Sequence, residues 1–70
     1  MTGAERSELR ARLAHDLKTP LAVIIGYGEL LGTRDDEATR VEASRMIVQA
    51  AERLSRDLDE LLERLLPEEG

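Results

Sequence analysis

The chain has 70 residues, one histidine, no cysteine, and a formal net charge of −5. A chain of this size forms at most one domain with a modest core, and neither a disulfide nor a structural zinc site with the usual four ligands can stabilise it. The acidic balance argues against nucleic acid as a partner, and the longest apolar run, Leu21 to Ile25, is too short to span a bilayer, so no direct membrane contact is expected.

The first predicted element is a helix over about residues 4–31. Thr2 and Glu5 have the spacing of a capping box, in which side chains satisfy backbone N–H groups at a helix start. Apolar or small residues then recur at steps of three and four, which keeps them on one helix face. They are Leu9, Leu13, Leu17, Leu21, Ile24, Gly28 and Leu31, and Val23, Ile25, Tyr27 and Leu30 broaden that face. His15 and Lys18 fall on the opposite side.

A loop over about residues 32–36 and a second helix over about residues 37–66 follow. Gly32 is expected to end the first helix in a left-handed conformation, and the segment from Thr33 to Asp36 carries turn and N-cap chemistry. In the second helix, two sets of residues seven apart have the spacing of a bundle seam. They are Ile47, Leu54 and Leu61, and Ala51, Leu58 and Leu65. Glu52 with Arg56, and Glu60 with Arg64, are expected to pair on the solvated face.

These elements predict an all-α fold, an antiparallel helical hairpin that occupies residues 1–70 as a single domain. Both apolar stripes are wider than one seam, so a second hairpin is needed to cover them, and we expect a homodimeric four-helix bundle. Pro20 lies inside the first helix, where it can either break the helix or kink it. The apolar phase continues unbroken across it from Leu13 to Leu31, which favours a kink.

The side chains best suited to catalysis or phosphate transfer lie in one stretch, His15-Asp16-Leu17-Lys18-Thr19-Pro20-Leu21. A neutral imidazole is a nucleophile that can carry a group covalently. Asp16 can accept a hydrogen bond from the protonated ring nitrogen if a bend at Pro20 brings the two together. Thr19 lies one turn after His15 and can orient a water, and Lys18 can neutralise a phosphate as a point charge. A lone exposed histidine is usually only a solvated side chain, but these neighbours at fixed offsets favour a phosphoacceptor.

This stretch resembles the H-box of the sensor histidine kinases, in their HisKA-type dimerisation and histidine phosphotransfer (DHp) domain. The segment Ile24 to Leu31 and the end of the second helix, Leu61 to Leu65, are similar to the same family. The resemblance implies that His15 is phosphorylated from ATP and that Asp16 is the general base. It also implies that Thr19 positions water for dephosphorylation of the partner regulator. Positions that match the family's contact with that regulator are Ala22, Val23, Gly26 and Tyr27.

The resemblance also implies partners: a second copy of the chain, the receiver domain of a response regulator, and the kinase's ATP-binding domain. No motif of an ATP-binding domain occurs in the chain, so ATP with Mg is expected to act through a separate catalytic domain. We expect no cofactor or metal bound by this chain and no autophosphorylation by the chain alone. The expected location is the cytoplasmic part of a bacterial sensor whose parent can be an inner-membrane protein, with Met1 and Gly70 as cut points in that longer protein.

Two alternatives remain open from the sequence. The chain can be a structural helical-hairpin dimerisation module whose histidine is incidental, or a stand-alone histidine phosphotransferase with no kinase domain of its own. Acid-labile, base-stable phosphate on His15 would exclude the purely structural module. The abrupt ends of both helical patterns favour a domain of a kinase over the stand-alone phosphotransferase.

Overall fold

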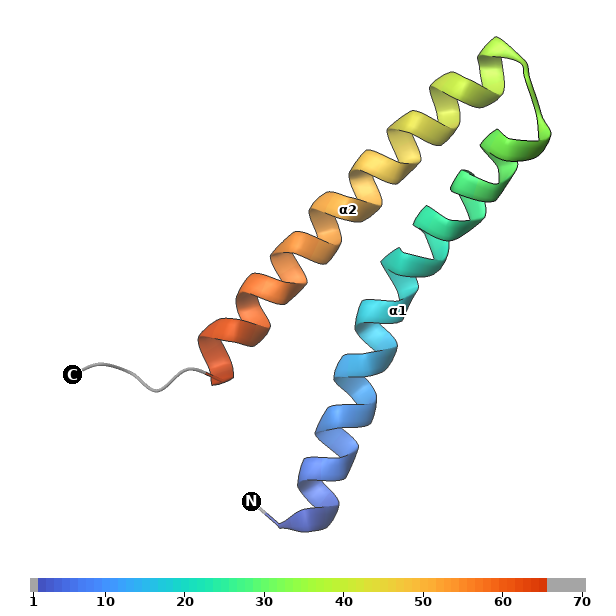
Figure 1. Cartoon of the computed structure of the whole chain (residues 1–70). Coiled ribbons are helices and arrows are strands. Elements are labelled where there is room, and N and C mark those ends of the chain that lie inside the picture. Colours follow the sequence, from blue (N-terminus) through green and yellow to red (C-terminus); the bar gives the residue numbers. More distant parts are fainter. Residues whose placement is uncertain (1, 66–70) are drawn as a thin grey trace.

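The computed structural model describes residues 2–65, with the side chains of residues 2–64. This part of the chain forms two helices, α1 (Gly3–Thr33) and α2 (Glu37–Leu65), joined by a loop over residues 34–36. The helices run antiparallel and pack against each other as a hairpin, with its turn at one end and both chain ends at the other (Figure 1). The predicted all-α hairpin is confirmed. The first helix is two residues longer than expected at its end, and Leu66, the expected end of the second, lies outside the described residues.

The start of α1 is capped by Thr2, which is one half of the predicted capping box; the Glu5 carboxylate accepts from the Thr2 hydroxyl and not from the Thr2 backbone N–H that the motif requires. The backbone N–H of Glu5 donates to the Thr2 hydroxyl at 3.1 Å, and that hydroxyl donates to the Glu5 carboxylate at 3.1 Å. Thr2 is in extended conformation and so stands outside the helix as its N-cap. The Thr2 side chain therefore satisfies one of the backbone N–H groups that the first turn leaves without a partner in the helix.

The end of α1 differs from the prediction at Gly32. The helix continues through this residue to Thr33, and none of the glycines in the described part of the chain has a positive φ. The Thr33 hydroxyl and the Arg34 backbone N–H both donate to the Leu30 carbonyl, at 3.1 and 3.0 Å. Because these bonds satisfy a terminal carbonyl while Arg34 leaves in extended conformation, no left-handed residue is needed.

The start of α2 is capped by Asp36, which confirms the cap chemistry expected there. The Thr39 hydroxyl donates to the Asp36 carboxylate at 2.8 Å and the Thr39 backbone N–H does so at 2.9 Å. These hydrogen bonds, helped by the charge of Arg34, lower the pKa of the Asp36 carboxyl from its ordinary value of 3.8. Asp35 instead points to solvent and pairs with Arg40 at 2.6 Å.

The seam between the helices is built around small residues and one proline. Pro20 is fully buried, and Ala43 and Ala50 are buried on α2. The half-buried side chains beside them include Leu13, Leu17, Ile24 and Tyr27 on α1, and Ile47, Leu54 and Leu61 on α2. The first heptad set predicted for α2 thus lies in the seam. The two alanines were not predicted, yet they carry the closest packing of α2.

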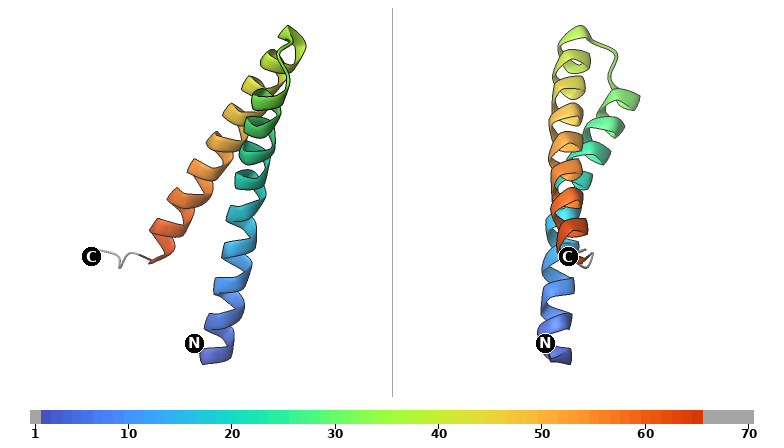
Figure 2. Two further views of the ribbon diagram at one scale, coloured as in Figure 1. Left: turned by 45° about the vertical axis from the view of Figure 1, so that its right-hand side comes forward. Right: turned by 90° about the vertical axis from the view of Figure 1, so that its left-hand side faces the viewer.

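Pro20 does not divide α1, so a break into three helices is excluded. The helix is continuous from Gly3 to Thr33 with the proline inside it. It bends in its middle third, which the right-hand view of Figure 2 shows where its colour passes from blue to green. A proline removes one N–H from the helix and its ring pushes against the carbonyl four residues before it, here that of Asp16.

A second apolar surface remains exposed on this hairpin. Its Cα atoms span 51 × 28 × 12 Å, so the molecule is a single layer of helices. The large apolar side chains that stay exposed are Leu9, Leu21, Ile25, Leu31, Val41, Val48, Leu58 and Leu62. Leu58 and Ala51, from the second predicted heptad set, belong to this exposed side, whereas the side chain of Leu65 lies outside the described residues.

The ion pairs on α2 are not those expected. Among residues 37–64, neither Glu52 with Arg56 nor Glu60 with Arg64 forms a pair, and Arg53 instead lies 3.9 Å from Asp57. Exposed pairs of this kind are worth little because water screens them, so spacing alone does not decide which of several forms.

Replacing Asp36, the N-cap residue of α2, tests how much this cap contributes to the stability of the chain. Asp36→Ala should lower the melting temperature at neutral pH, because the Thr39 N–H and hydroxyl lose their acceptor. The folded pKa is depressed, so the stabilisation is complete above the ordinary value of 3.8 and is lost as the pH falls through the folded pKa. Thermal unfolding followed by circular dichroism should therefore show a difference from wild type that shrinks in acid. Asp35→Ala is the control and should change little; an equal loss in both variants would contradict this role of Asp36.

Candidate functional site

His15 projects from α1 into solvent, away from the seam. Its side chain is 83% exposed, in agreement with the outward direction predicted from the helical phase. Neighbouring side chains cover little of the ring, so a large partner can approach it directly. An imidazole this exposed can present either ring nitrogen to a partner.

Asp16 lies beside His15 but does not hydrogen-bond to it in this state. The Asp16 Oδ1 atom is 3.8 Å from His15 Nδ1, which is longer than a hydrogen bond allows. The carboxylate is itself 58% exposed. The geometry thus brings together the predicted acid and imidazole and leaves a small side-chain rotation to complete the contact.

Thr19 and Pro20 complete the turn that follows His15. The Thr19 hydroxyl donates to the backbone carbonyl of His15 at 3.3 Å, so it is engaged with the helix rather than with the ring. Such bonds to the carbonyl four residues back often accompany helix bending. Pro20, next in the chain, is buried at the seam. Exposed reactive groups and a buried anchor therefore lie within about one and a half turns of helix.

Lys18 and Thr19 flank His15 on opposite sides of the exposed surface. At about 100° per residue, Lys18 lies about 60° to one side of His15 and Thr19 about 40° to the other. Lys18 is exposed, and no acidic side chain of residues 2–64 pairs with its ammonium group. A positive charge is thus free beside the imidazole, where an incoming anion would arrive.

The four predicted partner-contact residues line one shallow hollow. Ala22, Val23, Gly26 and Tyr27 meet there, and Leu30 completes the wall of a space of about 340 Å³. The hollow lies along α1 from the second turn after His15. A Cβ added at Gly26 would meet nothing within 4 Å, so this glycine leaves open space and not a close helix contact. Leu30 was not predicted as part of this site, although its spacing of four from Gly26 was a usable signal.

Other kinds of site are not formed by the described residues. Nowhere between residues 2 and 64 do three or more His, Cys, Asp or Glu side chains gather as metal ligands. Neither helix, over the part described, is long and apolar enough to cross a membrane.

Comparison with known proteins decides the family. The model of the His Kinase A (phospho-acceptor) domain matches residues 5–69. The chain belongs to the His Kinase A (phospho-acceptor) domain family. It is 44% identical over 61 residues to the histidine protein kinase SaeS of Staphylococcus aureus strain USA300, and equally to SaeS of strains NCTC 8325 and MW2.

The relatives are much longer than this chain. The match covers 81% of the chain but only 17% of each SaeS protein. No solved structure matches the chain. The resemblance inferred from His15 to Leu21 is confirmed, and the chain is a phosphoacceptor domain of the histidine kinase type.

A substitution in the hollow of this His Kinase A domain tests whether the space beside Gly26 is open. Gly26→Ala should stabilise the chain by about 0.5–1 kcal/mol, because alanine loses less backbone entropy than glycine in a helix and its methyl group enters open space. Thermal unfolding by circular dichroism measures the effect. The reverse change nearby, Ala22→Gly, should destabilise by a similar amount. A lower melting temperature for Gly26→Ala would mean that something packs closely on this glycine.

Proposed function

We propose that His15 is the phosphoacceptor of this domain and that its phosphoryl group passes to an aspartate of a response-regulator receiver domain. The observation that carries the proposal is the exposure of His15, 83% of its side chain, at a bent turn beside Asp16 and Thr19. Since it is the only histidine in the chain, no other side chain competes for the role in a phosphoacceptor domain of this family.

The transfer step follows from the chemistry of the ring. Nε2 attacks the γ-phosphorus of ATP with its lone pair, the N–P bond forms, and the bond to the bridging oxygen breaks with its electrons leaving on ADP. The Asp16 carboxylate, whose Oδ1 is 3.8 Å from Nδ1, acts as the general base and takes the Nδ1 proton as positive charge develops on the ring. Lys18 offers a cation to the phosphoryl oxygens.

Thr19 suits a second reaction, removal of phosphate from the regulator. Its hydroxyl is held to the His15 carbonyl by a long bond of 3.3 Å, which costs little to break. Once released, the hydroxyl lies on the same side of α1 as the imidazole and can orient a water towards a phosphoryl group bound there.

The hollow along α1 is the proposed docking site for the receiver domain. Ala22, Val23, Gly26 and Tyr27 line it together with Leu30, and it begins two turns beyond His15. A helix seated there would contact small and apolar side chains, while its neighbouring loops lie within reach of the imidazole. The absence of a side chain at Gly26 widens the space that such a helix needs.

The ATP for the first step comes, in this proposal, from a separate catalytic domain of the same kinase. The chain spans 17% of the length of the SaeS proteins it matches, which leaves ample length there for other domains. The cytoplasmic face of a bacterial sensor is the corresponding location for the domain.

We also propose that two hairpins pair into a four-helix bundle. Four of the exposed apolar side chains lie about 100–160° past the buried positions Pro20, Ala43 and Ala50 in the same rotational sense. They are Leu21 and Ile25 on α1, and Val48 and Leu62 on α2. Because α2 is antiparallel to α1, this places Leu21 and Ile25 on the same side of the hairpin as Val48 and Leu62. A single layer 12 Å thick cannot cover that side itself, and a second copy offers a matching apolar surface.

Phosphate labelling tests the acceptor. With ATP alone the chain should take up no phosphate, whereas with the matching kinase catalytic domain added it should take up acid-labile, base-stable phosphate. His15→Ala should abolish this label entirely because Nε2 is lost, and Lys18→Ala should only slow it. Equal labelling of His15→Ala would refute the assignment, and a folded dimer that never accepts phosphate would instead fit the structural module.

Sedimentation velocity tests the bundle. Ile25 is 60% exposed in the hairpin, so Ile25→Glu should convert a dimer into monomers by placing a charge in the apolar surface between copies. Gln49→Glu is the matched control, since it adds the same charge on the side that carries Thr19, and it should stay dimeric. A wild-type chain that is a folded, helical monomer at micromolar concentration would overturn the proposal.

A further inference from the structure

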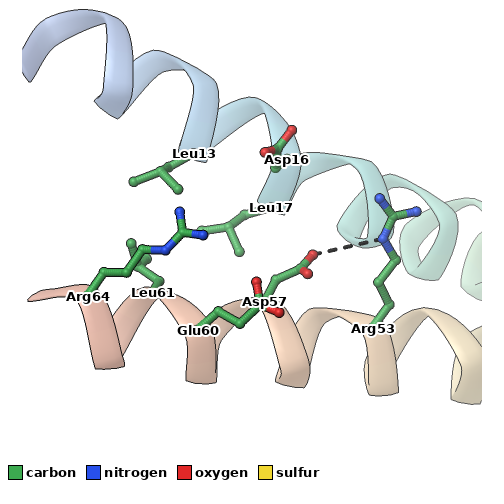
Figure 3. A pocket seen from close by; sticks show the side chains of 8 residues that line it. All are labelled: Leu13, Asp16, Leu17, Arg53, Asp57, Glu60, Leu61 and Arg64. Carbon is green, nitrogen blue, oxygen red and sulfur yellow. Dashed lines mark ion pairs between the residues drawn. The ribbon is translucent and has the colours of Figure 1, made fainter. Parts of the chain in front are cut away.

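A charged cleft opens between the helices beside the reactive turn. It has a volume of about 260 Å³ and lies between α1 and α2 in the half of the hairpin that is farther from the loop over residues 34–36 (Figure 3). Its lining residues on α1 are Leu13, Asp16 and Leu17, and on α2 they are Arg53, Asp57, Glu60, Leu61 and Arg64. The cleft therefore joins the acid next to His15 to a set of charged groups from the opposite helix.

Arg53 is one of two α2 arginines, with Arg64, that line the cleft together with Asp16. It also lines a second, smaller cleft of about 180 Å³ that it shares with Thr19 and Pro20. Arg53 thus borders both the space next to Asp16 and the space next to Thr19. Figure 3 shows its side chain reaching from α2 towards α1.

The present partner of Arg53 holds it weakly. Its Nε atom is 3.9 Å from Asp57 Oδ2, too far for a hydrogen bond, and no hydrogen bond to its guanidinium is found among residues 2–64. The base stands four residues before the acid, which is the less favourable order on a helix. The Arg53 side chain is 58% exposed, so water screens the pair. Little energy is needed to release Arg53 from Asp57.

Asp16 lines the same cleft as Arg53, so it offers the guanidinium a second carboxylate. The planar guanidinium group fits a carboxylate with two parallel hydrogen bonds, a better match than the present 3.8 Å approach of Asp16 to His15. An Asp16 carboxylate turned into the cleft towards Arg53 is turned away from the imidazole. The two contacts therefore compete for the same carboxylate.

We propose that Arg53 is a positioning residue for Asp16. The Arg53 guanidinium exchanges between Asp57 on its own helix and Asp16 across the cleft. Asp16 is therefore available to His15 while Asp57 holds Arg53. This inference rests on the proposed role of Asp16 beside the phosphoacceptor. It gives α2 a direct influence on that role, since the distance across the cleft depends on how the two helices sit. Lengthening that distance favours the Asp57 pair, and shortening it favours the Asp16 pair.

The tautomer of the imidazole reports the exchange without any phosphate chemistry. A carboxylate beside Nδ1 favours the proton on that nitrogen, and its removal shifts the proton towards Nε2. In ¹⁵N-labelled chain at about pH 8.5, where an ordinary imidazole is neutral, the ring nitrogen chemical shifts give the ratio of the two forms. The chains to compare are wild type, Asp57→Asn, Arg53→Gln and the double variant.

Asp57→Asn should free Arg53 to take Asp16, so the ratio should shift towards the Nε2–H form. The double variant should return to the wild-type ratio, because no guanidinium then competes for Asp16. Arg64→Gln is the control, as it removes the same group from the same cleft at the end beside Leu13, and it should leave the ratio unchanged. Circular dichroism establishes that each variant is helical.

An unchanged ratio in Asp57→Asn, or a double variant that stays shifted, would overturn the role of Arg53. A chain whose His15 accepts no phosphate would contradict the proposed function and yet leave this tautomer comparison intact. The two failures are therefore distinguishable.

Discussion

The burial of Pro20 links the reactive turn of α1 to the packing of the hairpin. Its ring is fully buried, while His15 and Asp16, one to one and a half turns earlier, and Thr19, the residue before it, are exposed. Because proline lacks an N–H, the helix bends at the carbonyl of Asp16, and packing of the ring against α2 near Ala50 holds that bend in place. The reactive turn is thus joined to the packed seam through a buried contact five residues after His15.

A single long helix can serve three surfaces because its side chains are spread around the axis. On α1, one side packs in the seam, the next carries Leu21 and Ile25, and the third carries His15 and the hollow at Gly26. The reactive groups stay hydrated, so the fold does not bear the cost of burying an imidazole or a carboxylate. The stability of the chain and the chemistry of His15 are therefore largely independent, which suits a side chain that must gain and lose a charged phosphoryl group.

The second helix contributes more than packing. Its buried alanines bring it close to α1 around Pro20, whereas beyond that point the seam widens into a cleft lined by Arg53 and Asp57. Charges on α2 are held there by weak, long contacts. Small changes in how the helices lie alter which carboxylate is nearest to a given guanidinium, so electrostatics near Asp16 respond to helix position while the core around Pro20 stays packed.

The sequence by itself determined everything that depends on near neighbours: the two helices, the caps at Thr2 and Asp36, the continuity of α1 through Pro20, and the outward direction of His15. It also pointed to four of the five residues that line the hollow. Helical periodicity defines angles about one axis, but it does not say which residues meet the other helix or which charges face each other across a cleft. Only the tertiary structure therefore decided that Ala43 and Ala50 form the closest packing, that Gly32 stays helical, and that Arg53 and Asp57 share a cleft with Asp16.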